Sequence, residues 1–171
     1  MNENDIKAGS HIPILCKAYE NGDGDILEMG SGMWSTPILH QLAFRNGNPK
    51  RRILTLETDP KWFEVNSKLF ESPMHQFKLV EDWETEKLID ETHWGLVLVD
   101  HKPALRRKAD IIRLKHRAHY ILAHDSEPEI SQYYKYHWCD KHFRYKYEFK
   151  EITPNTTVFS NYSDLGELKW K

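Results

Sequence analysis

Short apolar runs alternate along the chain with segments in which apolar residues recur every three or four positions. The runs are typical of buried strands, and the spaced pattern is typical of amphipathic helices. Asp59 and Pro60 have the residue types expected at the N-cap and first position of a helix. Up to that point the pattern predicts a helix over residues 10–21, a strand beginning at residue 26, a helix from residue 35 to about 46 and a strand over residues 52–57.

The remaining pattern ends in two adjacent strands. Aromatic and charged side chains alternate over residues 143–152, which predicts a strand with one buried face. Only three residues separate it from a strand predicted over 156–160, and a connection that short cannot make a parallel crossover. We therefore expect a parallel sheet closed by an antiparallel hairpin. Before this hairpin the pattern predicts helices over 87–91 and 103–117 and strands over 77–80, 94–100 and 120–123.

Length and charge limit the classes of protein to consider. A chain of 171 residues can form one domain with a sizeable core, so we expect a single domain over residues 1–171 in which residues 1–24 cap the core before the first strand. The net charge of −2 lacks the basic excess of a dedicated nucleic-acid binder, so nucleic acid is not an expected partner. The basic residues of the segment 103–117, including Arg107, are expected to form a solvated face, and a site for an anionic partner is the alternative.

The sequence contains no evident targeting or membrane signal. Its first residues lack a basic region followed by an apolar stretch, so we expect no signal peptide. No apolar run approaches the ~20 residues that a membrane span needs, so no membrane contact is expected. The two cysteines, Cys16 and Cys139, are too few for a disulfide framework and are expected to be free thiols in the cytoplasm.

The stretch D-I-L-E-M-G-S-G-M-W-S-T, residues 25–36, has the pattern of a strand, a glycine turn and a helix start. Gly30 and Gly32 can take positive φ and let a ligand approach the backbone, and the helix beyond them offers free N–H groups. Glu28, just before the glycines, would repel a pyrophosphate but suits a cationic ligand such as S-adenosylmethionine. The third glycine of the dinucleotide fingerprint is replaced by Ser35. An ordinary turn between strand and helix remains the alternative.

Acidic residues also follow the second and third predicted strands. Glu57 stands at the carboxyl end of its strand, where a carboxylate can accept hydrogen bonds from both hydroxyls of a ribose. A solvated acid is the alternative. Asp82 could accept the adenine amino group, and Trp83 could stack on the adenine ring or instead pack on the next helix.

Two pairs of titratable residues follow neighbouring strands, Asp100 with His101 and His124 with Asp125. Because neighbouring parallel strands end on the same cleft, these four are candidates for a catalytic base or a metal site. Either histidine could act as a base near neutral pH, and the carboxylates could hold Mg²⁺. The alternative is that His124 and Asp125 only cap the following turn.

Over most of its length the chain resembles the class I S-adenosylmethionine-dependent methyltransferases. L-E-M-G-S-G-M-W-S-T resembles the first motif of that family, L-T-L-E-T-D-P-K-W its second-strand motif, and L-V-L-V-D-H and I-L-A-H-D its fourth and fifth strand ends. V-D-H and A-H-D are similar to catechol O-methyltransferase-like and macrocin- or cephalosporin-type enzymes, in which acidic residues at these ends can hold Mg²⁺. H-D-S-E and T-T-V-F-S-N have a weaker similarity to glucuronoxylan-type sugar methyltransferases.

The resemblance implies a Rossmann-like α/β fold with seven strands in the order 3-2-1-4-5-7-6 and helices on both faces. It implies S-adenosylmethionine as cofactor and methyl transfer to a hydroxyl of a small molecule or sugar. A non-catalytic module that binds S-adenosylmethionine or a partner is the alternative. The implied catalytic residues are Asp100, His101, His124 and Asp125, and the implied cofactor site is Glu28, Gly30, Gly32, Ser35, Thr36, Glu57, Thr58, Asp82, Trp83 and Asp100.

The sequence also departs from the family. Lys102 and Pro103 directly follow His101, where catechol-type enzymes have an aromatic residue and then a lysine base. His124 stands where a metal-binding acid would be, so dependence on Mg²⁺ stays open. The N-P-P-Y type motif of amino-group DNA methyltransferases is replaced by D-H-K-P.

Two further groups of residues could bind ligands. The spacing of His137, Cys139 and His142 matches no structural zinc pattern. The second group could hold a sugar ring or a base, but packing is the alternative. It contains Tyr133, Tyr134, Tyr136 and Trp138.

Overall fold

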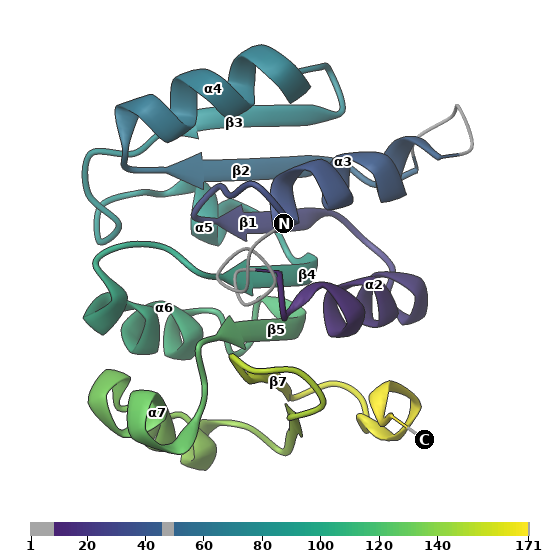
Figure 1. Ribbon diagram of the computed structural model, residues 1–171, viewed down its shortest axis with the longest axis vertical. Helices are drawn as coiled ribbons and strands as arrows, with labels where there is room; N and C mark the ends of the chain where they lie inside the picture. The colour runs from purple at the N-terminus through teal and green to yellow at the C-terminus, as the bar shows by residue number, and fades with distance from the viewer. Residues whose placement is uncertain (1–8, 46–49, 171) are drawn as a thin grey trace.

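The computed structural model describes residues 9–45 and 50–170. Its strands are β1 Ile26–Met29, β2 Ile53–Glu57, β3 His75–Leu79, β4 Trp94–Val99, β5 Ala118–His124, β6 Tyr145–Phe149 and β7 Thr156–Ser160. They form one seven-stranded sheet of order β3-β2-β1-β4-β5-β7-β6, which is stacked from top to bottom in Figure 1. The strands β1 to β5 are mutually parallel, whereas β7 is antiparallel to both β5 and β6. The predicted strand order and closing hairpin are confirmed.

Helices follow most strands. They are α2 Ile12–Asn21, α3 Ser35–Phe44, α4 Pro60–Phe70, α5 Leu88–Glu91, α6 Arg107–Arg113 and α7 Pro128–Tyr134, with 3₁₀ turns η1 Ala104–Arg106, η2 Tyr136–Trp138, η3 Asp140–His142 and η4 Gly166–Leu168. Asp59 is the N-cap of α4 as predicted, because its side chain accepts the backbone N–H groups of Lys61 and Trp62. The segment 46–49, predicted to end α3, lies outside the described residues.

The helix predicted over residues 103–117 is too long. Pro103 has extended backbone angles, and the chain after it begins as the 3₁₀ turn η1 before α6 forms. At the far end, the backbone N–H of Arg117 donates to the carbonyl of Leu114 over 2.8 Å, a tight turn that leads into β5. The solvated face expected here is also wrong for Arg107, which is only 5% exposed.

The core forms two layers, one on each face of the sheet. Successive residues of a strand point to opposite faces, so Ile26 packs with α2, α3 and η4, while Leu27 and Met29 pack with α5, α6 and η2. β4 is buried at all of its positions, as expected of a central strand covered on both faces. Within the described ranges no helix has both the length and the apolar character needed to cross a membrane.

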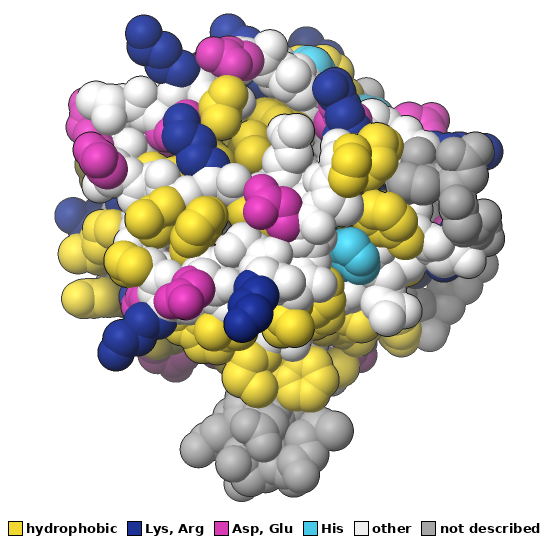
Figure 2. All heavy atoms as spheres, turned by 90° about the horizontal axis from the view of Figure 1, so that it is seen from above, with side chains coloured by type: hydrophobic (Ala, Val, Ile, Leu, Met, Phe, Trp, Pro, Cys, Tyr) yellow, Lys and Arg dark blue, Asp and Glu magenta, His cyan; other side chains and the backbone are white. Residues whose placement is uncertain are grey.

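At one edge of the sheet, α4 lies beside β3 (Figure 1). Trp62, Val65 and Leu69 of α4 are 39%, 54% and 67% exposed. Figure 2 shows hydrophobic side chains on this edge interspersed with charged ones. Of these three exposed side chains, Trp62 is nearest the carboxyl ends of the strands, because it lies in the first turn of α4 directly after β2.

Candidate functional site

A cavity of about 390 Å³ lies at the carboxyl ends of β1, β2 and β4. Ligands bind at this edge in open α/β sheets. Four residues of the predicted cofactor site, Gly30, Glu57, Thr58 and Asp100, are brought together in its wall. The complete lining is Gly30, Ser31, Glu57, Thr58, Asp59, Pro60, Trp62, Asp100, His101 and Lys102.

Gly30 is the glycine that the turn after β1 requires. Its φ is +93°, and a Cβ atom there would lie 2.8 Å from the carbonyl oxygen of Asp100 and from the backbone of His101. A larger residue would therefore clash with the end of β4. Gly32 is less constrained, since a Cβ atom there would first meet the Ser35 hydroxyl at 3.4 Å.

Glu28 lies beneath this turn and has no exposed surface. Its carboxyl group accepts hydrogen bonds from the hydroxyls of Thr36, at 2.9 and 3.0 Å, and Thr55, at 2.8 Å. Burial raises the pKa of Glu28 to about 7, although the hydroxyls of Ser35, Thr55 and Thr36 act in the opposite direction. Because Ser35 and Thr36 are also buried, these three predicted cofactor residues support the glycine turn from below and do not line the cavity.

Glu57 ties the glycine turn to the end of β2. One carboxylate oxygen accepts the backbone N–H and the hydroxyl of Ser31, at 2.7 and 2.9 Å. The other accepts the backbone N–H groups of Thr58 and Asp59, at 2.7 and 2.8 Å. These four bonds fix both oxygens at the cavity wall, and a ligand hydroxyl would replace one of the donors.

Asp82 and Trp83 do not line the cavity. Trp83 is only 3% exposed, its indole N–H donates to the carbonyl oxygen of Lys102 over 2.7 Å, and its ring stacks on His101. The carboxylate of Asp82 accepts the backbone N–H of Glu84 over 3.1 Å and so caps its own turn. Trp83 is therefore packed inside the protein and does not face the cavity, which is closer to the alternative of packing than to stacking on an adenine ring.

The aromatic residue at the cavity is Trp62, which the sequence analysis missed. It lies three residues after the N-cap Asp59, so its side chain leaves the first turn of α4 beside the cavity. Its position three residues after Asp59, and five after the acidic residue Glu57 at the end of β2, is the signal that could have identified it. Ser31 was missed in the same way, as the residue between the two glycines.

Beside the cavity lies a group of titratable side chains that we name the acid–imidazole cluster: His11, Asp100, Arg107, His124 and Asp125. His11, Arg107 and His124 are buried, whereas the two carboxylates are part-exposed. The guanidinium of Arg107 lies 2.8 Å from one oxygen of Asp100 and 3.0 Å from one oxygen of Asp125. The other oxygens of these carboxylates lie 3.2 and 3.5 Å from Nδ1 of His124. Three of the four predicted catalytic residues therefore meet.

His124 is bonded through both ring nitrogens. Nε2 lies 3.0 Å from the hydroxyl oxygen of Ser10, whose own hydrogen is donated to the carbonyl oxygen of Pro154 over 2.6 Å. The Ser10 oxygen must therefore accept a hydrogen from Nε2. Burial lowers the pKa of His124, but the hydrogen bond and charge of Asp100 outweigh it and raise the pKa overall. Burial likewise raises the pKa of Asp100, yet its bond to His124 and the neighbouring cations lower it to about 2.

His11 immediately precedes α2 and is 2% exposed. Its ring meets that of His124 edge-on, with 4.5 Å between the ring centroids. Burial, helped by the charge of His124, lowers the pKa of His11 to about 3, so the imidazole is neutral. Neither of its nitrogens has a hydrogen-bond partner among the described residues. His11, Asp100 and His124 each offer a donor atom within 4.8 Å of the other two, the only such potential metal-binding group in the described parts of the chain.

His101 lies apart from this cluster. Its Nε2 is 3.1 Å from a carboxylate oxygen of Asp110, and both side chains are fully buried. The ring stacks on Trp83 with 4.2 Å between centroids. His101 is part of the cavity wall although its side chain is fully buried, and its role as a base stays a prediction.

The two further groups have different surroundings. Cys139 is buried, with its sulfur 3.9 Å from the carbonyl oxygen of Lys108. Tyr136 is also buried, and its hydroxyl donates to the carbonyl oxygen of His124 over 3.2 Å, so it packs beneath the acid–imidazole cluster. Tyr133 and Trp138 are 63% and 52% exposed.

Neither a protein-family model nor a curated protein matches this sequence. Solved structures do match. Cofactor-bound Rv0187 from MTB shares 16% identity at a TM-score of 0.63, covering 95% of this chain and 82% of that one. The catalytic domain of human METTL16, which is a methyltransferase domain, in complex with MAT2A 3′UTR hairpin 1, shares 14% identity at a TM-score of 0.62, over 90% of this chain and 69% of that one. The protein has a methyltransferase fold.

An O-methyltransferase family protein from Burkholderia thailandensis shares 12% identity at a TM-score of 0.59. The match covers 94% of this chain but only 58% of that protein, so the chain spans little more than half of its length. Identities this low establish the shared fold and leave the reaction to be argued from the site.

Proposed function

We propose that the protein binds S-adenosylmethionine in the cavity at the carboxyl ends of β1, β2 and β4 and transfers its methyl group to a hydroxyl of a small molecule or sugar. One observation carries this proposal. Asp100 belongs both to the cavity wall and to the acid–imidazole cluster, so a ligand in the cavity would extend to a group of charged side chains. The methyltransferase fold of the matched structures supports the same assignment.

Each part of the cavity suits one part of this cofactor. The backbone at Gly30 and Ser31 allows close approach of the ligand, and the carboxylate of Glu57 is placed to accept ribose hydroxyls. Trp62 offers an indole face for the adenine ring. Asp100 stands at the other end, so the methyl group and its acceptor belong beside the cluster.

The acid–imidazole cluster would contact the acceptor. An attacking hydroxyl loses its proton near the transition state, so a proton-accepting group must lie within hydrogen-bond reach. The side chains of Asp100 and Asp125 are 27% and 29% exposed, and their carboxylates would accept a hydrogen bond from the acceptor's hydroxyl. As the hydroxyl oxygen bonds to the methyl group, the bond from that methyl to sulfur breaks, S-adenosylhomocysteine is left, and the hydroxyl proton passes to a carboxylate. His124 lies directly behind both carboxylates. A module that only bound S-adenosylmethionine would not need this cluster, which favours the enzyme.

Calorimetry with S-adenosylmethionine and S-adenosylhomocysteine tests the binding step. We expect the wild-type protein to bind both, and Trp62→Ala to weaken binding about threefold to tenfold because a stacking contact is lost. Glu57→Gln should weaken it about tenfold or more, since a charge-assisted hydrogen bond becomes neutral. Leu69→Ala is the matched control, because Leu69 lies on the same helix and outside the cavity. A folded wild-type protein that binds neither compound would refute the proposal.

Turnover tests the transfer step. The protein would be incubated with S-adenosylmethionine and separate panels of phenols, sugars and RNA, and methylated products would be detected by mass spectrometry. We expect a methylated hydroxyl compound, with rates reduced at least about a hundredfold in Asp100→Asn and Asp125→Asn. His137→Ala serves as a control away from the cluster. Methylation of RNA alone would overturn the acceptor class, and cofactor binding without any product would favour the non-catalytic module.

A further inference from the structure

The histidine His11 has no evident function in the interactions described so far. Its side chain is buried, with 2% exposure, and both ring nitrogens lack hydrogen-bond partners among the described residues. A buried polar group without a partner costs about 1–3 kcal/mol, which apolar residues of similar shape would avoid. Such a group in a folded protein therefore requires an explanation, and an ion bound beside it is one.

The atoms facing His11 are suited to a metal. Nδ1 of His124 and the nearer oxygen of Asp100 are 3.2 Å apart, and all three residues offer donors within 4.8 Å of one another. Two ligand atoms about 2.1 Å from one metal in tetrahedral geometry are about 3.4 Å apart. The distance between His124 and Asp100 is already close to this value, and the His11 nitrogen would move towards them to complete the site. Asp125, with an oxygen 3.5 Å from the same Nδ1, can serve as a fourth donor.

Neighbouring residues hold these donors in a suitable orientation. Arg107 binds one oxygen of Asp100 and one of Asp125, which leaves the other oxygen of each turned towards His124. Ser10 accepts the hydrogen of Nε2 of His124, and the neutral tautomer with hydrogen there presents its lone pair at Nδ1. Metal-binding histidines are oriented by hydrogen bonds of this kind.

We propose that His11, Asp100 and His124, with Asp125 beside them, form a binding site for a divalent transition metal such as Zn²⁺. Two imidazoles and a carboxylate are donors that Zn²⁺ and Fe²⁺ accept, whereas Mg²⁺ prefers oxygen ligands throughout. The site therefore does not fit the Mg²⁺ suggested by the family resemblance. Because Asp100 lines the cavity and is part-exposed, the site adjoins the cavity at this residue.

Metal binding does not depend on methyl transfer and can be measured without a methyl donor. A role for the ion in holding an acceptor oxygen rests on the proposed function. A metal on Nδ1 of His124 would also prevent that nitrogen from taking a proton. Nδ1 can therefore bind either the metal ion or a proton, but not both.

The test uses the whole chain, stripped of metal with a chelator and then titrated with Zn²⁺ in a calorimeter. We expect one Zn²⁺ per chain and a rise in the thermal unfolding midpoint. His11→Phe should bind Zn²⁺ at least about tenfold more weakly. Without metal this variant should be as stable as the wild type or more so, because the buried nitrogens of His11 have no partners to lose.

The control is His142→Ala, which removes a histidine from the group formed with His137 and Cys139. This variant should bind Zn²⁺ like the wild type. Equal Zn²⁺ affinity in His11→Phe and the wild type, or no Zn²⁺ binding by the wild type, would overturn the site. An equal rise of the midpoint with Mg²⁺ at the same concentration would assign it to oxygen ligands alone. If His11→Phe does not fold, His11→Leu takes its place, with the same weaker binding of Zn²⁺ expected for the site and the same affinity as the wild type overturning it.

Discussion

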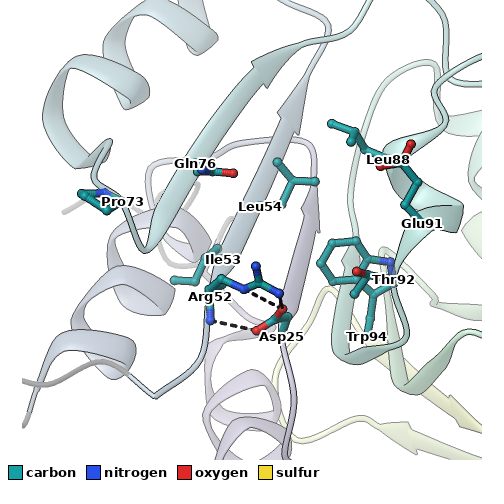
Figure 3. A pocket seen from close by; sticks show the side chains of 10 residues that line it. All are labelled: Asp25, Arg52, Ile53, Leu54, Pro73, Gln76, Leu88, Glu91, Thr92 and Trp94. Atoms are coloured by element: carbon teal, nitrogen blue, oxygen red, sulfur yellow. Dashed lines mark hydrogen bonds and ion pairs between the residues drawn. The ribbon is translucent and has the colours of Figure 1, made fainter.

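A cavity lies at each end of the sheet, and the arginine beside one cavity is exposed whereas the arginine beside the other is buried. At the amino ends of the strands, a cavity of about 190 Å³ has Arg52 and Asp25 at its side, joined by the dashed lines in Figure 3. Arg52 is 68% exposed and lies 2.6 Å from Asp25. At the carboxyl ends, Arg107 is only 6% exposed and binds both Asp100 and Asp125.

The two ends differ in the burial of the guanidinium, because the carboxylates Asp25, Asp100 and Asp125 are all part-exposed, at 19%, 27% and 29%. An ion pair with an exposed cation, such as Arg52, gains little, because water and salt screen it. A buried guanidinium pays a large desolvation cost that an apolar side chain would avoid. The proposed binding of cofactor and acceptor at the carboxyl ends would account for the desolvation cost of Arg107.

The largest effect is expected at the buried guanidinium. Arg107→Met leaves Asp100 and Asp125 without their cation, so unfolding in denaturant should become easier by about 3–5 kcal/mol. Arg107→Lys keeps the charge but loses the forked guanidinium that binds two carboxylates. Its free energy of unfolding should lie between those of Arg107→Met and the wild type. A loss below about 1 kcal/mol in Arg107→Met would mean that the two cavities do not differ in this respect.

A smaller effect is expected from Glu28 as the pH changes. Its pKa is raised from 4.5 to about 7 in the folded protein, so between these values the folded chain holds a proton that the unfolded chain has lost. The resulting stability is fully present below pH 4.5 and is lost as the pH rises through 7, by about 3 kcal/mol in all.

This dependence is measured as the difference between the wild type and Glu28→Gln in denaturant unfolding from pH 4 to 8. The difference is needed because His11 and His75, whose pKa values are lowered to about 3, make stability rise with pH over part of the same range. The same pH profile in both proteins would show that Glu28 is ionised throughout.

The smallest effect is expected at the amino-end cavity. Arg52→Met removes the exposed pair with Asp25 and should cost less than about 1 kcal/mol, with the difference disappearing in ~1 M salt. Unfolding measurements at low and high salt check this. A salt-independent loss as large as that of Arg107→Met would remove the distinction between the two ends.

Local chemistry was enough to predict much of the fold. The connection between the last two strands, three residues in the predicted bounds and six between β6 and β7, is too short for a parallel crossover. Asp59 followed by Pro60 marks the start of α4. Gly30 was predicted to take a positive φ in the turn after β1, and it does so at +93°. These features depend on residues close together in the sequence, where spacing is informative.

The site was harder because it depends on distant residues. Asp100, His124 and Asp125 could be grouped, as parallel strand ends meet at one edge. His11 and Ser10 could not, because nothing in a helix start more than a hundred positions away indicates contact with His124. Arg107 lies in a basic run, and only the packing distinguishes it from its solvated neighbours.

The bond from Ser10 to the carbonyl oxygen of Pro154 spans 144 positions of the chain. Synthesis proceeds from the amino terminus, so the sheet strands β1 to β5 can pair while later residues are still inside the ribosome. The hydrogen bonds through Ser10 that orient His124 can be completed only after the β6–β7 connection has emerged and folded back on the first helix. A nascent chain can therefore form its parallel strands before this support exists, and a chain shortened before residue 154 would lack both the carbonyl that Ser10 binds and the strand β7.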